Sequence, residues 1–253
     1  MPELDFRSPR LFVDAPLREG QTVALDRDQS NYLGNVLRLT SGDTVLVFNG
    51  SDGEWRAKIA GRKRPDSLAI QSRTRPQDRL PDLAYVFAPL KHARLDYMVQ
   101  KAVEMGASKL QPVLTRHTQV SRVNSERMRA NVIEAAEQCG ILCLADVAEP
   151  VALDRYLGER GQGRLLVFCD EATDTHNPLQ ALRAGAAPTK GVDVLIGPEG
   201  GFAEEERTLL LRQPQTLRLA LGPRILRADT AGVAALALVQ TVLGDWQGSA
   251  NGR

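Results

Sequence analysis

The sequence lacks the features that mark membrane, secreted and metal-binding proteins. It has no run of about 18 apolar residues, so we expect no membrane span, and its first ten residues contain no apolar segment of a secretory signal. Its three histidines have no metal-ligand spacing, so we expect no metal: His92, His117 and His176. Its three cysteines form no CxxC pair: Cys139, Cys143 and Cys169. We expect them to be small buried residues in a reducing cytoplasm, because a catalytic thiol would need a positioned base.

The chain has an ordinary composition but an uneven distribution of charge. Its 253 residues, 43% hydrophobic and 25% charged, are typical of one large or two modest globular domains. The formal net charge is only +1, yet eight basic residues lie between Arg56 and Arg79, opposed by Asp66 and Asp78 alone. This excess favours a surface for a polyanion, or equally a solvated face of a strand pair.

The first part of the chain is rich in short strands. The alternation of apolar and polar residues predicts strands at 11–13, 22–26, 43–50, 54–61 and 67–72, and helical spacing predicts one helix over 28–39. Several short strands with a single helix are typical of a small barrel. Residues 73–82 carry two prolines and five charged residues, so we expect a domain boundary near Pro76–Pro81.

After this boundary, strands alternate with helices. Strands are predicted at 83–90, 109–115, 164–171, 192–197 and 216–222, and helices at 94–106, 124–140, 204–213 and 229–246. This alternation predicts an α/β domain whose mostly parallel sheet is covered on both faces. The last helix is apolar on nearly all sides, so we expect it to be buried.

A glycine-rich turn follows the predicted strand at 192–197, and its sequence is Gly197-Pro198-Glu199-Gly200-Gly201. It lacks the lysine of a phosphate-binding P-loop and the GxGxxG spacing of a dinucleotide fingerprint. Three glutamates, 204–206, occupy the first turn of the next helix and complement its dipole, so a phosphate would meet like charge. The turn therefore suits a neutral or cationic ligand, or it is a tight turn that binds nothing.

The next strand ends in the same way, at Gly222-Pro223, and a helix capped by Asp229 or Thr230 follows. Because ligands of open α/β sheets bind outside the carboxyl ends of the strands, we expect the two turns to form adjacent walls of one pocket. Arg224 and Arg227 project from the second turn.

These two segments, LIGPEGGF at 195–202 and LGPRILRADTA at 221–231, resemble the paired signature of the bacterial 16S ribosomal RNA uridine-N3 methyltransferases of the SPOUT superfamily. Further similar segments are LDYMVQKAVEMG, PVLTRHTQV and EAAEQCG, and NYLGNVLRLTSGD at 31–43 is similar to the family's PUA-like RNA-binding domain. The resemblance covers nearly the whole chain. It departs at Ile141, where the family usually has arginine, and at Asp229, where glutamate is commoner.

The resemblance implies a PUA-like β-barrel over 1–76 and a SPOUT methyltransferase domain with a deep trefoil knot over 77–253. It implies a cytoplasmic homodimer that binds S-adenosylmethionine and 16S ribosomal RNA in the small ribosomal subunit, without membrane or metal. The implied cofactor contacts are Leu195, Ile196, Gly197, Pro198, Glu199, Gly200, Gly201, Leu219, Leu221, Gly222, Ile225 and Leu226. The candidate RNA contacts are Arg7, Arg10, Arg38, Arg62, Lys63 and Arg64.

Methylation of uridine N3 requires that its proton leave, so a base or an anion-stabilising group is needed. Glu199 is a candidate base, although holding the turn is its preferred role. Arg227, and similarly Arg224, would stabilise charge on the uracil oxygens, contact phosphate, or pair with an acidic residue such as Asp229. Two other functions compete: a non-catalytic RNA-binding ribosome-assembly protein with the same fold, and a nucleotide-dependent enzyme, which the glycine spacing disfavours. We expect His117 to face solvent rather than RNA.

Overall fold

The computed structural model describes residue 5 and residues 7–120, 122–173, 177–185, 188 and 190–247. The chain divides into two compact units. Unit 1 comprises Met1–Arg79 with Ile133–Leu144, and unit 2 comprises Leu80–Val132 with Ala145–Arg253. His176 lies outside the described residues.

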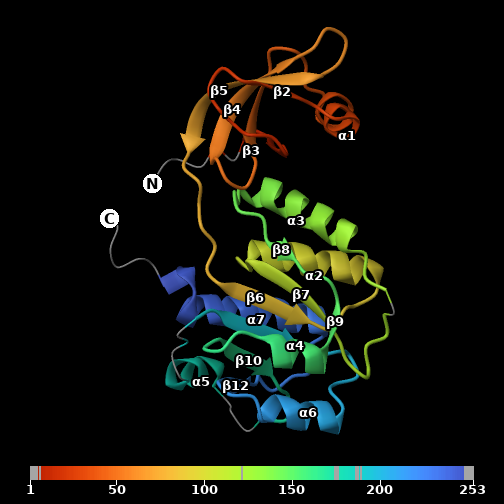
Figure 1. Ribbon diagram of the computed structural model, residues 1–253, viewed down its shortest axis with the longest axis vertical. Coiled ribbons are helices and arrows are strands. Elements are labelled where there is room, and N and C mark those ends of the chain that lie inside the picture. Colours follow the sequence, from red (N-terminus) through yellow and green to blue (C-terminus); the bar gives the residue numbers. More distant parts are fainter. Residues whose placement is uncertain are drawn as a thin grey trace. The chain divides into compact units, whose positions relative to one another are not determined.

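Unit 1 is built on a five-stranded, barrel-like sheet (Figure 1). Its strands are β1 (Arg10–Phe12), β2 (Thr22–Ala24), β3 (Thr44–Phe48), β4 (Glu54–Ala60) and β5 (Ser67–Arg75), in the order β1-β3-β4-β5-β2. Neighbouring strands are antiparallel except the parallel pair β1 and β3. Alternate residues of these strands point inward, so Val45, Val47 and Leu68 are buried in one core with Leu33.

The predicted helix at 28–39 has two parts. Asp26 caps helix α1 (Arg27–Asn31). Its side chain accepts a hydrogen bond from the Gln29 backbone N–H at 2.7 Å, and the Gln29 side-chain oxygen accepts one from the Asp26 backbone N–H at 3.0 Å. The chain then continues as a π-helix, η1 (Tyr32–Val36). The hydrophobic periodicity could not predict this wider turn, because over so few residues the apolar positions fit an α-helix and a π-helix equally well.

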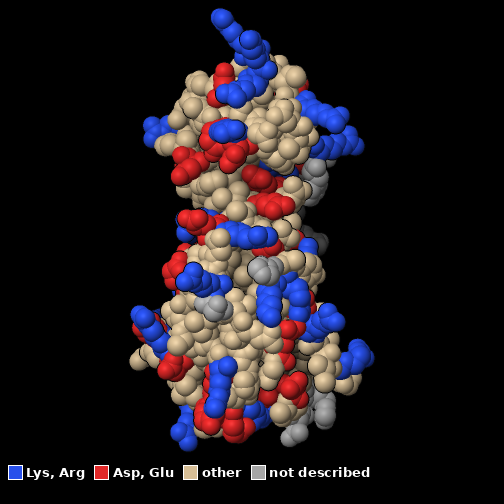
Figure 2. Space-filling model, turned by 90° about the vertical axis from the view of Figure 1, so that its right-hand side faces the viewer, with Lys and Arg blue, Asp and Glu red and all other residues tan. Residues whose placement is uncertain are grey.

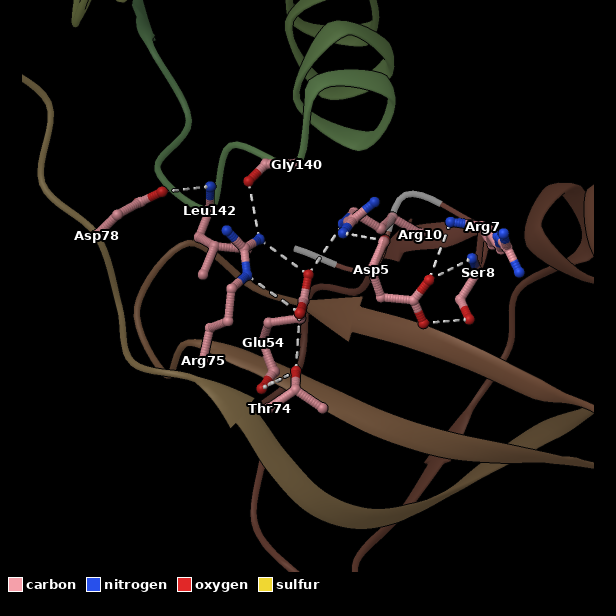
Figure 3. A network of polar contacts seen from close by, with 10 residues as sticks. All are labelled: Asp5, Arg7, Ser8, Arg10, Glu54, Thr74, Arg75, Asp78, Gly140 and Leu142. Atoms are coloured by element: carbon pink, nitrogen blue, oxygen red, sulfur yellow. Dashed lines mark hydrogen bonds and ion pairs between the residues drawn. The ribbon is translucent and has the colours of Figure 1, made fainter. Parts of the chain in front are cut away.

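A buried carboxylate in unit 1 holds two arginines, and one of them also bonds the backbone that follows helix α3 (Ser125–Cys139; Figure 3). The Glu54 carboxylate accepts from Arg10 Nε at 2.9 Å, from Arg75 Nη2 at 2.9 Å and from Thr74 Oγ1 at 2.8 Å. Arg75 Nη2 also donates to the Gly140 carbonyl at 2.8 Å. Glu54 is only 2% exposed, and its partners hold the pKa of its carboxyl below the usual value in spite of burial.

Unit 2 is an α/β layer structure. Its seven strands are β6 (Leu83–Phe87), β7 (Lys109–Leu114), β8 (Asp146–Val147), β9 (Val151–Ala152), β10 (Leu165–Cys169), β11 (Val192–Ile196) and β12 (Thr216–Leu219). The order is β12-β10-β11-β6-β7-β8, with β9 paired to β7, and the strand pairs are parallel. Strands β6 and β11 are buried along their whole length, as expected of a parallel sheet covered on both faces.

The helices of unit 2 connect these parallel strands (Figure 1). They are α2 (His92–Glu104), α3 (Ser125–Cys139), which ends in unit 1, α4 (Leu153–Glu159), α5 (Pro178–Ala184), α6 (Glu204–Leu211) and α7 (Ala228–Leu243), followed by the 3-10 turn η2 (Asp245–Gln247). Helix α2 packs against α7. No helix in the described part of the chain has the length and apolarity needed to cross a bilayer.

The structure corrects four details. Strands β8 and β9 and helices α4 and α5 were not predicted, because each is too short for a periodic pattern. Helix α7 is only half buried, since Val233, Ala237 and Leu238 remain partly exposed. Cys139 is exposed rather than buried. Arg227 is the N-cap residue of α7, and Asp229 lies in its first turn.

Candidate functional site

Two loops leave the carboxyl edge of the parallel sheet of unit 2. The first, residues 197–203, joins β11 to α6, and the second, residues 220–227, joins β12 to α7. Because both strands run parallel, both loops leave the same edge. The two strands are not neighbours, because β10 lies between them. That the two turns form adjacent walls of one pocket stays a prediction.

Two glycines shape the first loop. A Cβ at Gly197 would lie 2.5 Å from the Phe202 ring, and Gly201 has φ +70°, which favours glycine. Gly200 differs, because a Cβ there would lie 3.4 Å from the His117 Cβ, an ordinary contact. The packing of the protein itself therefore does not require glycine at 200. A glycine at this position leaves the backbone open to a flat ligand.

Glutamate side chains already complement the positive end of the α6 helix dipole and accept from backbone N–H groups near the helix start. Glu206 accepts from the backbone N–H groups of Ala203, at 2.9 Å, and of Arg116, at 2.8 Å. Glu204 and Glu205 complete an acidic first turn. This helix start therefore offers an anion little, and a cationic group such as a sulfonium fits it better.

Arg94 of helix α2 connects the first loop to the first turn of α7. Its Nε donates to Asp229 Oδ2 of α7 at 2.9 Å, and its Nη1 pairs with Glu199 Oε1 of the first loop. Hydrogen bonding to Arg94 lowers the pKa of the Asp229 carboxyl, and both carboxylates raise the pKa of the Arg94 guanidinium above its usual value. The sequence reasoning missed this residue. Arg94 lies in the segment that follows the carboxyl end of β6, the neighbour of β11, and that position is the signal that could have identified it.

A cavity of about 180 Å³ lies beside the first loop. It is lined by Lys91, Arg94, His117, Pro198 and Glu199, together with Pro89, Leu90, Gln119 and Val120. His117 Nδ1 lies 2.9 Å from the Gly201 carbonyl oxygen. Since a carbonyl only accepts, Nδ1 carries the proton and the ring is fixed against the loop.

A second cavity, of about 290 Å³, lies among residues that begin the strands, at the opposite edge of the sheet. Four of its charged residues form one network of ion pairs: Asp82, Arg160, Arg164 and Asp193. Arg164 lies 2.7 Å from Asp82 and 2.8 Å from Asp193, which is 1% exposed. This cavity therefore has the character of a structural ion network rather than of a ligand site.

The second loop is more exposed than the first. Gly222 has φ +107°, and the Ile225 side chain is 91% exposed. Arg224 and Arg227 are exposed, and Asp229 pairs with Arg94. Leu195, Ile196 and Leu219 are buried in their strands and would offer a ligand only their backbone groups. Leu221 and Leu226 are half buried in the loop.

In unit 1, five of the six candidate RNA contacts are exposed: Arg7, Arg38, Arg62, Lys63 and Arg64. Arg10 differs, because it is 6% exposed and paired with Glu54. The turn that carries residues 62–64 lies against η1, since a Cβ at Gly34 would approach the Pro65 Cδ to 3.0 Å. On the face shown in Figure 2, basic and acidic side chains are interspersed, without one continuous patch of either sign. In the described residues, no group of three His, Cys, Asp or Glu side chains is placed to hold a metal.

Both domains of the chain match family models of RNA methyltransferases. A family model described as RNA methyltransferase domain matches residues 77–240, and one described as RNA methyltransferase PUA domain matches residues 25–68. The chain belongs to the ribosomal RNA small subunit methyltransferase E family.

Individual relatives agree. The ribosomal RNA small subunit methyltransferase E of Rickettsia conorii is 30% identical over 91% of this chain and 94% of its own length, and that of Synechocystis is 32% identical over 88% of this chain and 74% of its own. The crystal structure of the Neisseria gonorrhoeae enzyme bound to S-adenosyl methionine superposes with a TM-score of 0.84, at 26% identity, over 95% of this chain and 100% of that one.

Proposed function

We propose that the protein transfers a methyl group from S-adenosylmethionine to N3 of a uridine in 16S ribosomal RNA. The observation that carries the proposal is the pair of loops at one edge of the sheet, with Arg94 joining the first loop to the start of α7, in a chain that belongs to this methyltransferase family. The crystal structure of the Neisseria gonorrhoeae member of the family contains bound S-adenosyl methionine.

The residues of the two loops fit this cofactor. Gly200 leaves backbone accessible, the first loop carries no basic side chain, and the acidic start of α6 suits a positive charge. We propose that the cofactor contacts are the residues from Leu195 to Gly201, together with Leu219, Leu221, Gly222, Ile225 and Leu226, with a trefoil knot forming the binding region. When bound, the cofactor supplies an electrophilic methyl group on a sulfonium.

The side chains around this region have separate roles. Glu199 is paired with Arg94, which supports a role in holding the loop rather than in accepting a proton. Arg224 and Arg227 are exposed on the second loop, where a guanidinium suits a planar base or a phosphate. Alignment of N3, methyl carbon and sulfur contributes the rest of the acceleration.

Unit 1 would dock the RNA. Its exposed basic turn at 62–64 and Arg38 offer phosphate contacts, and Val36, 60% exposed on η1, offers an apolar contact beside them. We place the domain boundary at residues 76–77 and the substrate within the small ribosomal subunit. Because 16S ribosomal RNA is a bacterial cytoplasmic molecule, we place the enzyme in the cytoplasm.

The protein would act as a homodimer. Helix α7 presents partly exposed Val233, Ala237 and Leu238, and Tyr97 of α2 and Trp246 of η2 are 45% and 51% exposed. An apolar surface of this kind is typical of a subunit interface. Light scattering coupled to gel filtration tests it, and a monomer at micromolar concentration would refute it.

Mass spectrometry of ribosomal RNA from a deletion strain tests the function. We expect one N3-methyluridine in 16S ribosomal RNA to disappear and to return on complementation. An unchanged level would refute the proposal. The second candidate, a non-catalytic ribosome-assembly protein, would leave RNA methylation unchanged and show no heat of binding when titrated with S-adenosylmethionine.

A further inference from the structure

The cavity beside the first loop is lined by two cationic side chains, of which one is ion-paired within the described part of the chain and the other is not. Arg94 is shared between two carboxylates, Glu199 and Asp229. Lys91, the N-cap residue of α2, is exposed and has no ion-pair partner among the described residues. The lining of the cavity includes Glu199 but not Asp229, and Lys91 adds to it a positive charge that no carboxylate of the described residues shares.

One nitrogen of the Arg94 guanidinium, Nη2, has no hydrogen-bond partner among the described residues. The Nε and Nη1 atoms of Arg94 are engaged, whereas Nη2 is buried. A buried donor without an acceptor costs about 1–3 kcal/mol, and such groups need an explanation. Because Nη2 itself has almost no exposed surface, an acceptor oxygen in the cavity would reach it only after the Arg94 side chain, which lines the cavity, shifts toward the ligand.

We propose that this cavity holds the uracil ring of the acceptor nucleotide, with Lys91 and Arg94 donating to its two carbonyl oxygens. The inference rests on the proposed function and names the residues that recognise its substrate. The cavity, of about 180 Å³, has room for one pyrimidine ring, and it lies beside the loop that carries the open Gly200 backbone.

The chemistry of the lining favours uracil over the other bases. Uracil presents two carbonyl acceptors that flank N3, whereas cytosine replaces one of them with an amino donor. An amino group facing Lys91 or Arg94 would place donor against donor and leave both unsatisfied. Pro89 and Pro198 give the cavity apolar surface for a flat ring.

The same two cations lower the barrier of the reaction. The N3 proton leaves to solvent water, which reaches the exposed Lys91 side of the cavity, and the resulting charge spreads over both carbonyl oxygens. The N3–CH3 bond then forms as the S–CH3 bond breaks, and the electron pair of the broken bond stays on sulfur. Donors aimed at the oxygens stabilise this anion more than neutral uracil, so they accelerate the step.

The test compares Lys91→Gln with Lys190→Gln, a substitution of an exposed lysine elsewhere in unit 2. Single-turnover methylation is measured on 16S RNA, or on small subunits assembled from it, made with uridine and with 5-fluorouridine. Fluorine at C5 withdraws electrons and lowers the pKa of N3. It therefore stabilises the N3 anion and replaces part of the stabilisation that Lys91 supplies. Affinity for S-adenosylmethionine is measured by calorimetry.

We expect Lys91→Gln to slow methylation of uridine RNA about 100-fold, to keep cofactor affinity within about twofold, and to lose much of its deficit on 5-fluorouridine RNA. Lys190→Gln should match the wild type on both RNAs. An equal deficit on the two RNAs, or no deficit, would overturn the proposal. Failure of the proposed function is distinguishable, because then the wild-type protein would methylate neither RNA.

Discussion

Replacing Gly200 with valine separates ligand binding from folding. The structure predicts a small effect on stability, because a Cβ at this position meets the His117 Cβ at 3.4 Å and no closer atom, and Gly200 is absent from the glycines with positive φ. We therefore expect the free energy of unfolding to change by less than about 1 kcal/mol.

The effect on cofactor binding should be large. A valine side chain would hold a flat ligand away from the loop backbone, which loses a hydrogen bond of about 1 kcal/mol together with the dispersion contacts of the displaced ring. A combined loss of about 3 kcal/mol corresponds to a more than 100-fold weaker affinity for S-adenosylmethionine.

Titration calorimetry measures the affinity, and thermal unfolding checks the fold. Gly158→Val is a matched control, because Gly158 lies on α4 of the same unit with open space around its Cβ position, and it should bind the cofactor normally. A folded Gly200→Val protein with wild-type affinity would show that the first loop does not bind the cofactor.

Three further outcomes are expected. Arg227→Ala should leave the affinity for S-adenosylmethionine within about twofold but slow single-turnover methylation at least about tenfold; wild-type turnover would exclude a role in catalysis. Changing Arg62, Lys63 and Arg64 to glutamine should weaken RNA binding and reduce the slope of log K against log salt by about 2 to 3, as filter binding can measure; an unchanged slope would remove this turn from the RNA contacts. Glu137 of α3 accepts from the Phe12 N–H at 2.8 Å, and burial raises the pKa of its carboxyl to about 7. Because that pKa is above the unfolded value, the folded state binds the extra proton, and stability is lost as pH rises from about 4.5 through 7. Glu137→Gln should therefore be more stable than wild type by up to about 2 kcal/mol at pH 8 and equal to it at pH 5 in urea unfolding, and the same difference at both pH values would contradict this.

Much of the architecture of unit 2 follows from local patterns. The apolar runs that became β6 and β11 are uninterrupted, as a strand buried on both faces requires, and the helical spacing at 94–106 matches α2 closely. The acidic start of α6 was also predicted correctly. Short elements such as α4 and β9 were missed, because two to seven residues are too few to establish a period.

Some features of the candidate site could likewise be predicted from the sequence, and others could not. The order of residues along the chain determined that two strands end in glycine-proline turns, that the first turn is acidic, and that both turns leave one edge of a parallel sheet. Only the tertiary structure decided that β10 separates those strands, that Arg94 joins Glu199 to Asp229, and that Arg10 is buried against Glu54. Local patterns arise from the repeat of a helix or strand over a few residues, whereas ion pairs between distant residues depend on how the strands are ordered in the sheet, which no local repeat encodes.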